Sequence, residues 1–175
     1  MDRQKYIVYV AVSADGYIAE KDGSVGWLHT YPAAVFGFDA FLARVDTVVM
    51  GRATFNQALA YGGPWPYENK RVIVLTSKAL PREAPSGAEA WRDSVPALKA
   101  ALGRTNETVW IAGGARTIRS ALGHGLVHQF ELYVVPRLLG EGIPLFLPGS
   151  RPTDLRLSEA AQLPRDVVRL RYEVL

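Results

Sequence analysis

The sequence predicts an α/β fold: a mostly parallel central sheet, flanked by helices, that ends in an antiparallel C-terminal hairpin. Short apolar, β-branched runs recur along the chain and are separated by helix-compatible segments, as in βαβ units. Residues 167–175 alternate between apolar and charged side chains, the pattern of a half-buried strand. The turn at 164–166 pairs this strand with 155–163 as a hairpin. A parallel sheet with an antiparallel edge accounts for both patterns.

The first elements follow from the apolar pattern near the N-terminal end. Residues 6–12 form an apolar, β-branched run, which predicts a strand that the polar, glycine-bearing segment 13–16 ends. A brief apolar return follows at 17–19. Between 34 and 45 the apolar side chains recur at the spacing of one helix face, so we expect a single helix there.

The next segments alternate between strand and helix. The run 46–50 predicts a strand that ends at Gly51, and a short helix follows through Leu59. Glycine and proline exclude regular structure at 62–66. The third strand is 71–75, and a proline-rich surface stretch follows it.

The second half of the chain repeats this order. A helix is expected over 96–102, with Ser94 or Val95 near its cap and Pro96 tolerated in its first turn. The apolar run at 109–112 predicts a buried strand. Residues 116–122 are compatible with helix and 130–135 with strand, and a glycine-rich loop covers 138–146.

Length and composition limit the protein classes. We expect 175 residues to form one domain, 1–175, and 49% hydrophobic residues exclude a disordered chain. No apolar stretch could span a bilayer and no signal-peptide pattern is present, so a cytoplasmic location is the default expectation. The absence of cysteine excludes thiolate catalysis, and three scattered histidines predict no metal site.

The charge pattern favours a small anionic ligand over a nucleic acid. The net charge is only +3, the basic residues are spread along the chain, and no nucleic-acid-binding motif is present. A pI near 9.3 is the sole support for nucleic-acid binding.

Three predicted strand ends carry residues suited to phosphate. Gly113 and Gly114 end one strand, where a missing Cβ lets backbone approach a ligand and the next helix directs its N–H groups at it. Gly51 ends another and is followed by Arg52 and Thr54. The third ends in 76–78, with two hydroxyls and an ammonium. Ligands of open α/β sheets bind beyond these strand ends. Tight turns and capped helix starts remain the alternative explanation.

These residues resemble the dihydrofolate-reductase-like fold, in particular the reductase domain of bifunctional riboflavin-biosynthesis deaminase-reductases. The matching stretches lie in the family's order and cover nearly the whole chain: VSADGYIA at 12–19, Trp27, DTVVMGRATF at 46–55, VLTS at 74–77, IAGG at 111–114 and PRLLGEGIPLF at 136–146. Stand-alone members lack the deaminase half. This chain also lacks cysteine and a zinc-deaminase signature.

The resemblance implies NADPH across the carboxyl ends of the strands. Arg52 and Lys78 would lie near the adenosine 2′-phosphate, and the backbones of Ala11 and Ile18 would receive the carboxamide. Core packing is the alternative for Ala11 and Ile18. The implied cofactor residues are Ala11, Ile18, Gly51, Arg52, Thr54, Leu75, Thr76, Ser77, Lys78, Gly113, Gly114, Ala115, Arg116 and Thr117.

The resemblance is less complete at the substrate site. Dihydrofolate reductases carry an acidic residue early in the first helix, and that position falls near Gly37 here, with Asp39 displaced. Asp15 and Asp39 are the candidate proton donors, and Asp15 is preferred. The alternatives are that Asp15 is only a turn residue and that Asp39 is only a solvated helix residue. Trp27 and Phe41 are expected at the substrate, although Trp27 also suits a buried anchor.

We therefore expect an NADPH-dependent reductase of a pyrimidine or pteridine substrate, resembling 5-amino-6-(5-phosphoribosylamino)uracil reductase. Dihydrofolate reductase, or a non-catalytic NADPH-binding domain, are the alternatives. The family commonly forms homodimers, and 133–135 together with the alternating C-terminal strand offers apolar surface for one.

Overall fold

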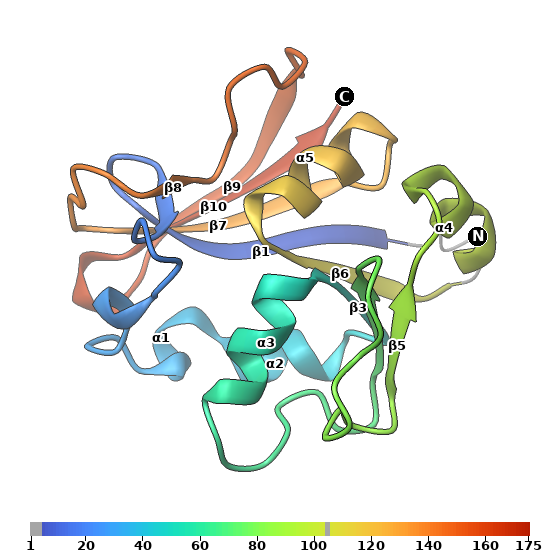
Figure 1. Cartoon of the computed structure of the whole chain (residues 1–175). Coiled ribbons are helices and arrows are strands. Elements are labelled where there is room, and N and C mark those ends of the chain that lie inside the picture. Colours follow the sequence, from blue (N-terminus) through green and yellow to red (C-terminus); the bar gives the residue numbers. More distant parts are fainter. Residues whose placement is uncertain (1–4, 104–105) are drawn as a thin grey trace.

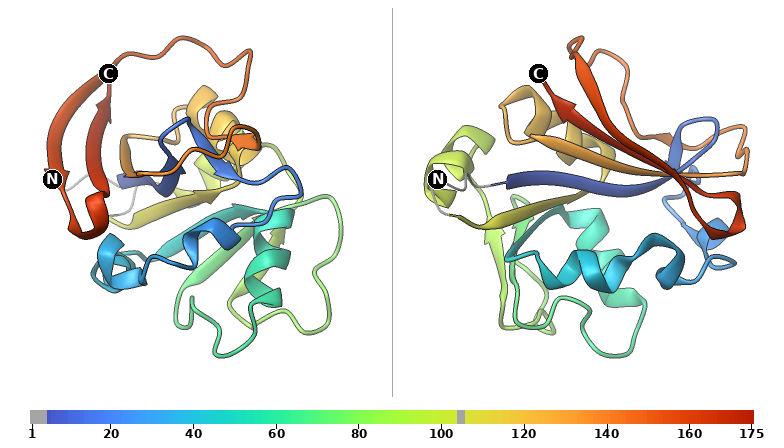
Figure 2. Two further views of the ribbon diagram at one scale, coloured as in Figure 1. Left: turned by 90° about the vertical axis from the view of Figure 1, so that its left-hand side faces the viewer. Right: turned by 180° about the vertical axis from the view of Figure 1, so that it is seen from behind.

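The computed structural model describes residues 5–103 and 106–175, which build a twisted eight-stranded sheet (Figures 1 and 2). Its strand order is β5-β4-β3-β6-β1-β7-β10-β9. The strands from β5 to β7 in this order run parallel, whereas β10 is antiparallel to β7 and β9 is antiparallel to β10. The predicted fold class, a mostly parallel sheet with an antiparallel C-terminal hairpin, is confirmed.

The element bounds agree with most of the expected segments. The strands are β1 Lys5–Ser13, β2 Tyr17–Ala19, β3 Thr47–Gly51, β4 Arg71–Leu75, β5 Ala88–Trp91, β6 Thr108–Gly113, β7 Gln129–Val135, β8 Ile143–Pro144, β9 Leu155–Gln162 and β10 Val168–Val174. The helices are α1 Ala33–Phe36, α2 Phe38–Ala43, α3 Arg52–Ala60, α4 Val95–Leu102 and α5 Ala115–Gly123, with short 3₁₀ turns at 26–28 and 164–166. The strands β2 and β8 pair in a small sheet of their own.

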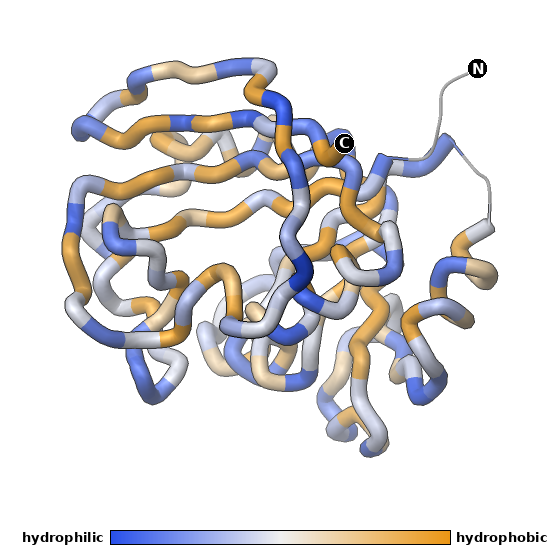
Figure 3. The backbone as a smooth tube through the Cα atoms, turned by 90° about the horizontal axis from the view of Figure 1, so that it is seen from above, coloured by the Kyte–Doolittle hydropathy of each residue, from blue (hydrophilic) through white to orange (hydrophobic). Residues whose placement is uncertain are grey.

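Helices cover both faces of the large sheet, which is why its central strands are apolar throughout. The helices α4 and α5 pack on one face, α2 and α3 on the other. Alternate residues of β1 serve the two faces: Val8 packs with α4 and α5, while Tyr9 packs with α2 and α3. Figure 3 shows hydrophobic stretches along the central strands and mainly hydrophilic connecting loops. Within the described residues, no helix is long and apolar enough to cross a membrane.

The single helix expected over 34–45 is wrong, because Gly37 interrupts it. Gly37 has φ 63°, a left-handed conformation that suits glycine, and it separates α1 from α2. The hydroxyl of Tyr9 donates a hydrogen bond to the carbonyl of Phe36 at 2.7 Å and fixes this break. Phe41 of α2 still packs on the sheet, as the apolar spacing requires.

Two short strands were not expected from the sequence. The strand β5 lies at the sheet edge within the proline-rich stretch, and β8 has two residues inside the glycine-rich loop. Neither contains a run of β-branched residues long enough to indicate a strand.

The charged face of β10 is paired with acidic side chains. Arg171 contacts Glu131, whose side chain is 1% exposed, at 3.0 Å, and Arg44, the residue after α2, contacts the same carboxylate at 2.8 Å. Arg169 and Arg171 both pair with Glu159 of β9. The ion pairs join the hairpin to α2 and to β7.

Two of the three side chains expected to form a dimer surface at 133–135 are buried in the core. Tyr133 and Val135 lie in the core, with 2% and 0% of their surface exposed, and Val134 is partly buried. Tyr133 packs against Tyr9 and Phe36 in the core on the α2 side of the sheet. Tyr133 and Val135 therefore offer no apolar surface, whereas Leu157 of β9 and Val168 of β10 are exposed.

Candidate cofactor and active site

The three predicted phosphate turns lie side by side. The strand β3 lies between β4 and β6, with Gly51 opposite Leu75 and Met50 opposite Gly113. Because neighbouring parallel strands end at the same edge, the turns that follow them meet there. The sheet order thus confirms that the three strand ends converge.

The turns before α3 and α5 are in close contact. A Cβ on Gly51 would stand 2.8 Å from Thr117 Oγ1, and one on Gly114 would stand 3.7 Å from Thr54 Oγ1. The Gly113–Gly114 peptide is cis, and Gly113 has φ 107°. The missing side chain at Gly51 is therefore what allows the two helix starts to lie together.

The first turns of α3 and α5 differ from that of α4. Ser94 caps α4, since its Oγ accepts a hydrogen bond from Ala97 N at 3.2 Å. At α3 and α5 the N-cap residues are glycines, no cap side chain accepts such a bond, and the first turn has no acidic residue. Two adjacent helices thus present backbone donors and their positive dipole ends at one edge, which suits an anion. The alternative of side-chain-capped helix starts does not describe these two turns.

Arg52 extends from α3 to the loop after β4. Its Nη1 donates to the carbonyl of Ala79 at 2.8 Å, and its Nε donates to Asn56 Oδ1 at 2.9 Å. In the same loop, Lys78 N donates to Thr76 Oγ1 at 3.2 Å, and Ser77 and Lys78 are exposed. The guanidinium of Arg52 and the 76–79 loop therefore belong to one surface.

Arg92 joins this edge and was missed in the sequence. It follows β5, where Trp91 pairs with Leu75 and its carbonyl accepts from Thr76 N at 3.1 Å. Four neighbouring strands are each followed by a basic residue: Arg52, Lys78, Arg92 and Arg116. In the described part of the chain none of these four forms an ion pair with a carboxylate. Arg92 could have been predicted from the sequence only if β5 had been recognised as a strand, because Arg92 directly follows it.

The other implied cofactor residues occupy different settings. Ala11 is half-buried near the carboxyl end of β1, and Ile18 lies on β2, half-buried against the core. Ala115 and Thr117 are buried in the first turn of α5, whereas Arg116 between them is exposed.

Asp15 is bound by a network of hydrogen bonds. Ser13 Oγ donates to its Oδ1 at 2.6 Å, and the backbone N–H groups of Leu139 and Gly140 donate at 3.1 Å and 2.7 Å. These bonds, that from Ser13 foremost, lower the pKa of the exposed Asp15 carboxyl below its ordinary value. The carboxylate is consequently ionised at neutral pH, which opposes the role of a proton donor.

The remaining candidate residues are not gathered in one cluster. Trp27 is 3% exposed, and its Nε1 has no hydrogen-bond partner among the described residues. Phe41 is also 3% exposed and stacks on Tyr9 with ring centroids 4.0 Å apart, so its ring is engaged in the core. Asp39 is exposed in the first turn of α2. Of the three, Trp27 alone offers a buried polar atom that a ligand could satisfy.

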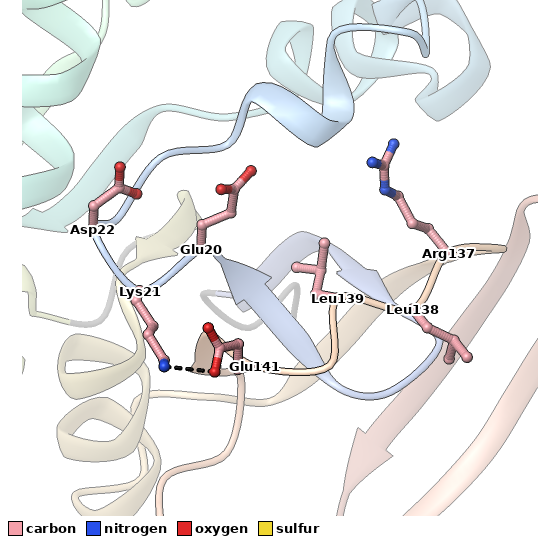
Figure 4. Close-up of a pocket in the computed structure, with 7 residues that line it drawn as sticks. All are labelled: Glu20, Lys21, Asp22, Arg137, Leu138, Leu139 and Glu141. Atoms are coloured by element: carbon pink, nitrogen blue, oxygen red, sulfur yellow. Dashed lines mark ion pairs between the residues drawn. The ribbon is translucent and has the colours of Figure 1, made fainter.

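A pocket of about 510 Å³ lies between the loop after β2 and the loop after β7 (Figure 4). Lys21 Nζ and Glu141 Oε2 approach to 2.5 Å beside it, and the side chains of Glu20, Asp22 and Arg137 point away from this ion pair. Among the described residues no group of three or more histidine or acidic side chains could hold a metal ion.

An α/β sheet with two uncapped helix starts and a basic carboxyl edge is typical of proteins that bind nucleotides. The family model of the RibD C-terminal domain matches residues 4–169. The chain therefore belongs to the RibD C-terminal domain family.

Individual relatives agree with this assignment. YwjB of Bacillus subtilis is 33% identical over 176 residues, covering 97% of each chain. Dihydrofolate reductase HdrB of Haloferax volcanii is 35% identical over 130 residues, covering 69% of this chain and 62% of HdrB.

Solved structures share the fold. A protein of Shewanella sp. PV-4 that is assigned to riboflavin biosynthesis is 30% identical, with a TM-score of 0.84 over 97% of this chain and 98% of that one. The Thermotoga maritima diaminohydroxyphosphoribosylaminopyrimidine deaminase/5-amino-6-(5-phosphoribosylamino)uracil reductase has a TM-score of 0.69 at 16% identity. The match covers 99% of this chain and 57% of that protein, and it bears on the fold alone.

Proposed function

We propose that the protein is an NADPH-dependent reductase of a pyrimidine or pteridine type substrate. The observation that carries the proposal is the pair of helix starts at Gly51 and Gly114, adjacent and without side-chain caps. Such a pair suits a pyrophosphate, because free N–H groups and two helix dipoles act on the same charge.

The basic residues around this pair favour NADPH over NADH. Arg52 is held over the 76–79 loop, where its guanidinium and the ammonium of Lys78 suit the adenosine 2′-phosphate. NADPH, when bound, supplies a hydride. The chain's task is to orient the nicotinamide against the substrate and to exclude water.

The substrate side of the proposal rests on Trp27 and on the relatives. A buried indole N–H without a partner suits a carbonyl or ring-nitrogen acceptor of a heteroaromatic substrate. The Shewanella protein is assigned to riboflavin biosynthesis, which favours a ribosylaminopyrimidine such as 5-amino-6-(5-phosphoribosylamino)uracil.

Dihydrofolate is the second candidate substrate, because HdrB is a dihydrofolate reductase. Two features disfavour it. The position that carries an acidic residue in dihydrofolate reductases falls near Gly37, at the break between α1 and α2, and the nearby Asp39 is exposed.

The experiment is NADPH oxidation by the purified chain, followed by absorbance with the aminopyrimidine, with dihydrofolate, or with no acceptor. We expect oxidation with the aminopyrimidine. Oxidation with dihydrofolate alone would assign the second function. Tight NADPH binding without turnover of either compound would favour a non-catalytic NADPH-binding domain.

A further inference from the structure

The carboxylate of Asp15 joins two loops that are distant in sequence. It follows β1, yet both of its oxygens accept hydrogen bonds from the loop after β7. Leu139 N lies 3.1 Å from each oxygen and Gly140 N lies 2.7 Å from Oδ2. A single carboxylate thus orders the turn that contains these two amides.

The same bonding extends to β2 through Ser13. Ser13 is 1% exposed, and its Oγ donates to Asp15 while accepting from Tyr17 N at 2.9 Å. Tyr17 is the first residue of β2, and Ile18 follows it. The chain of bonds Tyr17–Ser13–Asp15–Gly140 therefore sets β2 and the 137–141 loop in one fixed arrangement.

Backbone contacts close the junction on both sides of Asp15. Ala14 N donates to the carbonyl of Arg137 at 2.8 Å, and Leu145 N donates to the carbonyl of Gly16 at 2.9 Å. Beyond them, β2 pairs with β8, and a Cβ on Gly142 would stand 2.3 Å from the carbonyl oxygen of Ala19. The two loops are closely fitted, with Asp15 as the charged group at the junction.

We propose that Asp15 is a positioning residue and not the proton donor: it fastens the 137–141 loop to the β1–β2 turn and so holds β2 in place at the reaction site. The inference rests on the proposed function, because the backbone of Ile18 is where the nicotinamide carboxamide is expected. The loop that carries Glu20 and Asp22 continues from β2, so it is held by the same junction (Figure 4).

Hydrogen–deuterium exchange of the full chain tests the junction without any ligand. In Asp15→Asn one acceptor oxygen becomes an amide nitrogen, so the side chain can no longer accept from Ser13 Oγ with one atom and from Gly140 N with the other. We therefore expect exchange in 137–146 and in 17–19 to rise by about threefold to tenfold, the effect of losing a hydrogen bond to a charged group at an exposed site. Ser13→Ala should raise exchange in 17–19 in the same way.

Asp22→Asn is the matched control. Asp22 is an exposed aspartate on the neighbouring loop that accepts from Ser24 N, and its replacement should leave exchange in 137–146 unchanged. Unchanged exchange there in Asp15→Asn, with the wild-type circular dichroism spectrum, would overturn the proposal.

The binding of two nucleotides distinguishes a local effect of Asp15 on β2 from a general loss of structure. Asp15→Asn should weaken the binding of NADPH by about threefold to tenfold. The affinity for adenosine 2′,5′-bisphosphate, which lacks the nicotinamide, should stay at the wild-type value. Equal weakening of both would overturn the local role. If the wild type binds neither, the proposed function fails, and exchange alone still decides whether Asp15 holds the junction.

Discussion

Gly51 and Thr117 lie against each other across the turns that begin α3 and α5. A Cβ at Gly51 would stand 2.8 Å from Thr117 Oγ1, closer than packed atoms tolerate. Gly51 has φ −79° and ψ 163°, which any residue can adopt, so the demand for glycine is steric. This contact sets the spacing of the two helix starts proposed to hold the cofactor pyrophosphate.

Gly51→Ala should therefore destabilise the fold through overpacking. We expect a loss of about 1–3 kcal/mol in the free energy of unfolding, measured by urea denaturation. Thr117→Ala removes the opposing oxygen, so the double variant should recover most of that loss. An unchanged midpoint in Gly51→Ala would show that the turns adjust freely.

Arg52→Ala should lower NADPH affinity by about 1.5–3 kcal/mol, roughly 10- to 150-fold, the range for a hydrogen bond to a charged group. The affinity for NADH, which lacks the 2′-phosphate, should change little. Calorimetric titration with both nucleotides measures the difference. Arg71→Ala is the control, because Arg71 begins β4 at the opposite edge and pairs with Glu89. Equal losses for NADPH and NADH would remove Arg52 from the phosphate site.

Arg92→Ala tests whether the basic residue after β5 belongs to the cofactor site, together with those after β4, β3 and β6. A single cation near the 2′-phosphate should contribute about 0.5–1 kcal/mol at an exposed site, so NADPH binding should weaken by about twofold to fivefold. The salt dependence of NADPH affinity should also become shallower, since one charge is lost. If Arg92→Ala binds NADPH with wild-type affinity at low salt, the cofactor site is limited to the residues after β4, β3 and β6.

The stability of the protein should depend on pH through Asp15. Its pKa is lower in the folded chain than the ordinary value of 3.8, so its ionised form favours folding. That stabilisation is present above the unfolded pKa and is lost as the pH falls through the folded pKa. The melting temperatures of the wild type and Asp15→Asn should therefore differ at neutral pH and converge below pH 3.8. A constant difference down to the most acid pH would contradict this assignment.

A homodimer remains our prediction, although its surface must differ from the one expected. Leu157 of β9 is 51% exposed and pairs with Tyr172, while Val168 of β10 is 36% exposed. The two residues lie on neighbouring strands of the C-terminal hairpin. We expect Leu157→Asp to shift the mass from dimer to monomer in light scattering. A wild-type monomer at micromolar concentration would refute the prediction.

The sequence predicted the elements whose signal is local. The central strands at 6–12 and 71–75 carry short β-branched runs, 130–135 is mainly apolar and aromatic, and strand 168–174 of the C-terminal hairpin has strict alternation. The helix at 34–45 was misjudged because its apolar spacing continues through Gly37 even though the backbone turns there. The edge strand β5 carries no such run, so it depends on pairing with β4.

The site shows the same division between local and distant signals. Glycines at the strand ends predicted a shared ligand edge, because parallel strands end at the same side of a sheet. That Gly51 and Gly114 are neighbours depends on β3 lying beside β6, an order that no local pattern indicates. The role inferred for Asp15 depends on amides more than 120 residues away: its bonds to Leu139 and Gly140 span 124 and 125 positions. No local pattern indicates such a pairing.

The most direct test of the central claim is calorimetric titration of the wild-type chain with NADPH and NADH under the same conditions. Two uncapped helix starts beside Arg52 and Lys78 predict that NADPH binds at one site per chain and at least about tenfold more tightly than NADH. Binding of neither nucleotide, or equal affinity for both, would contradict the assignment of this edge to the cofactor.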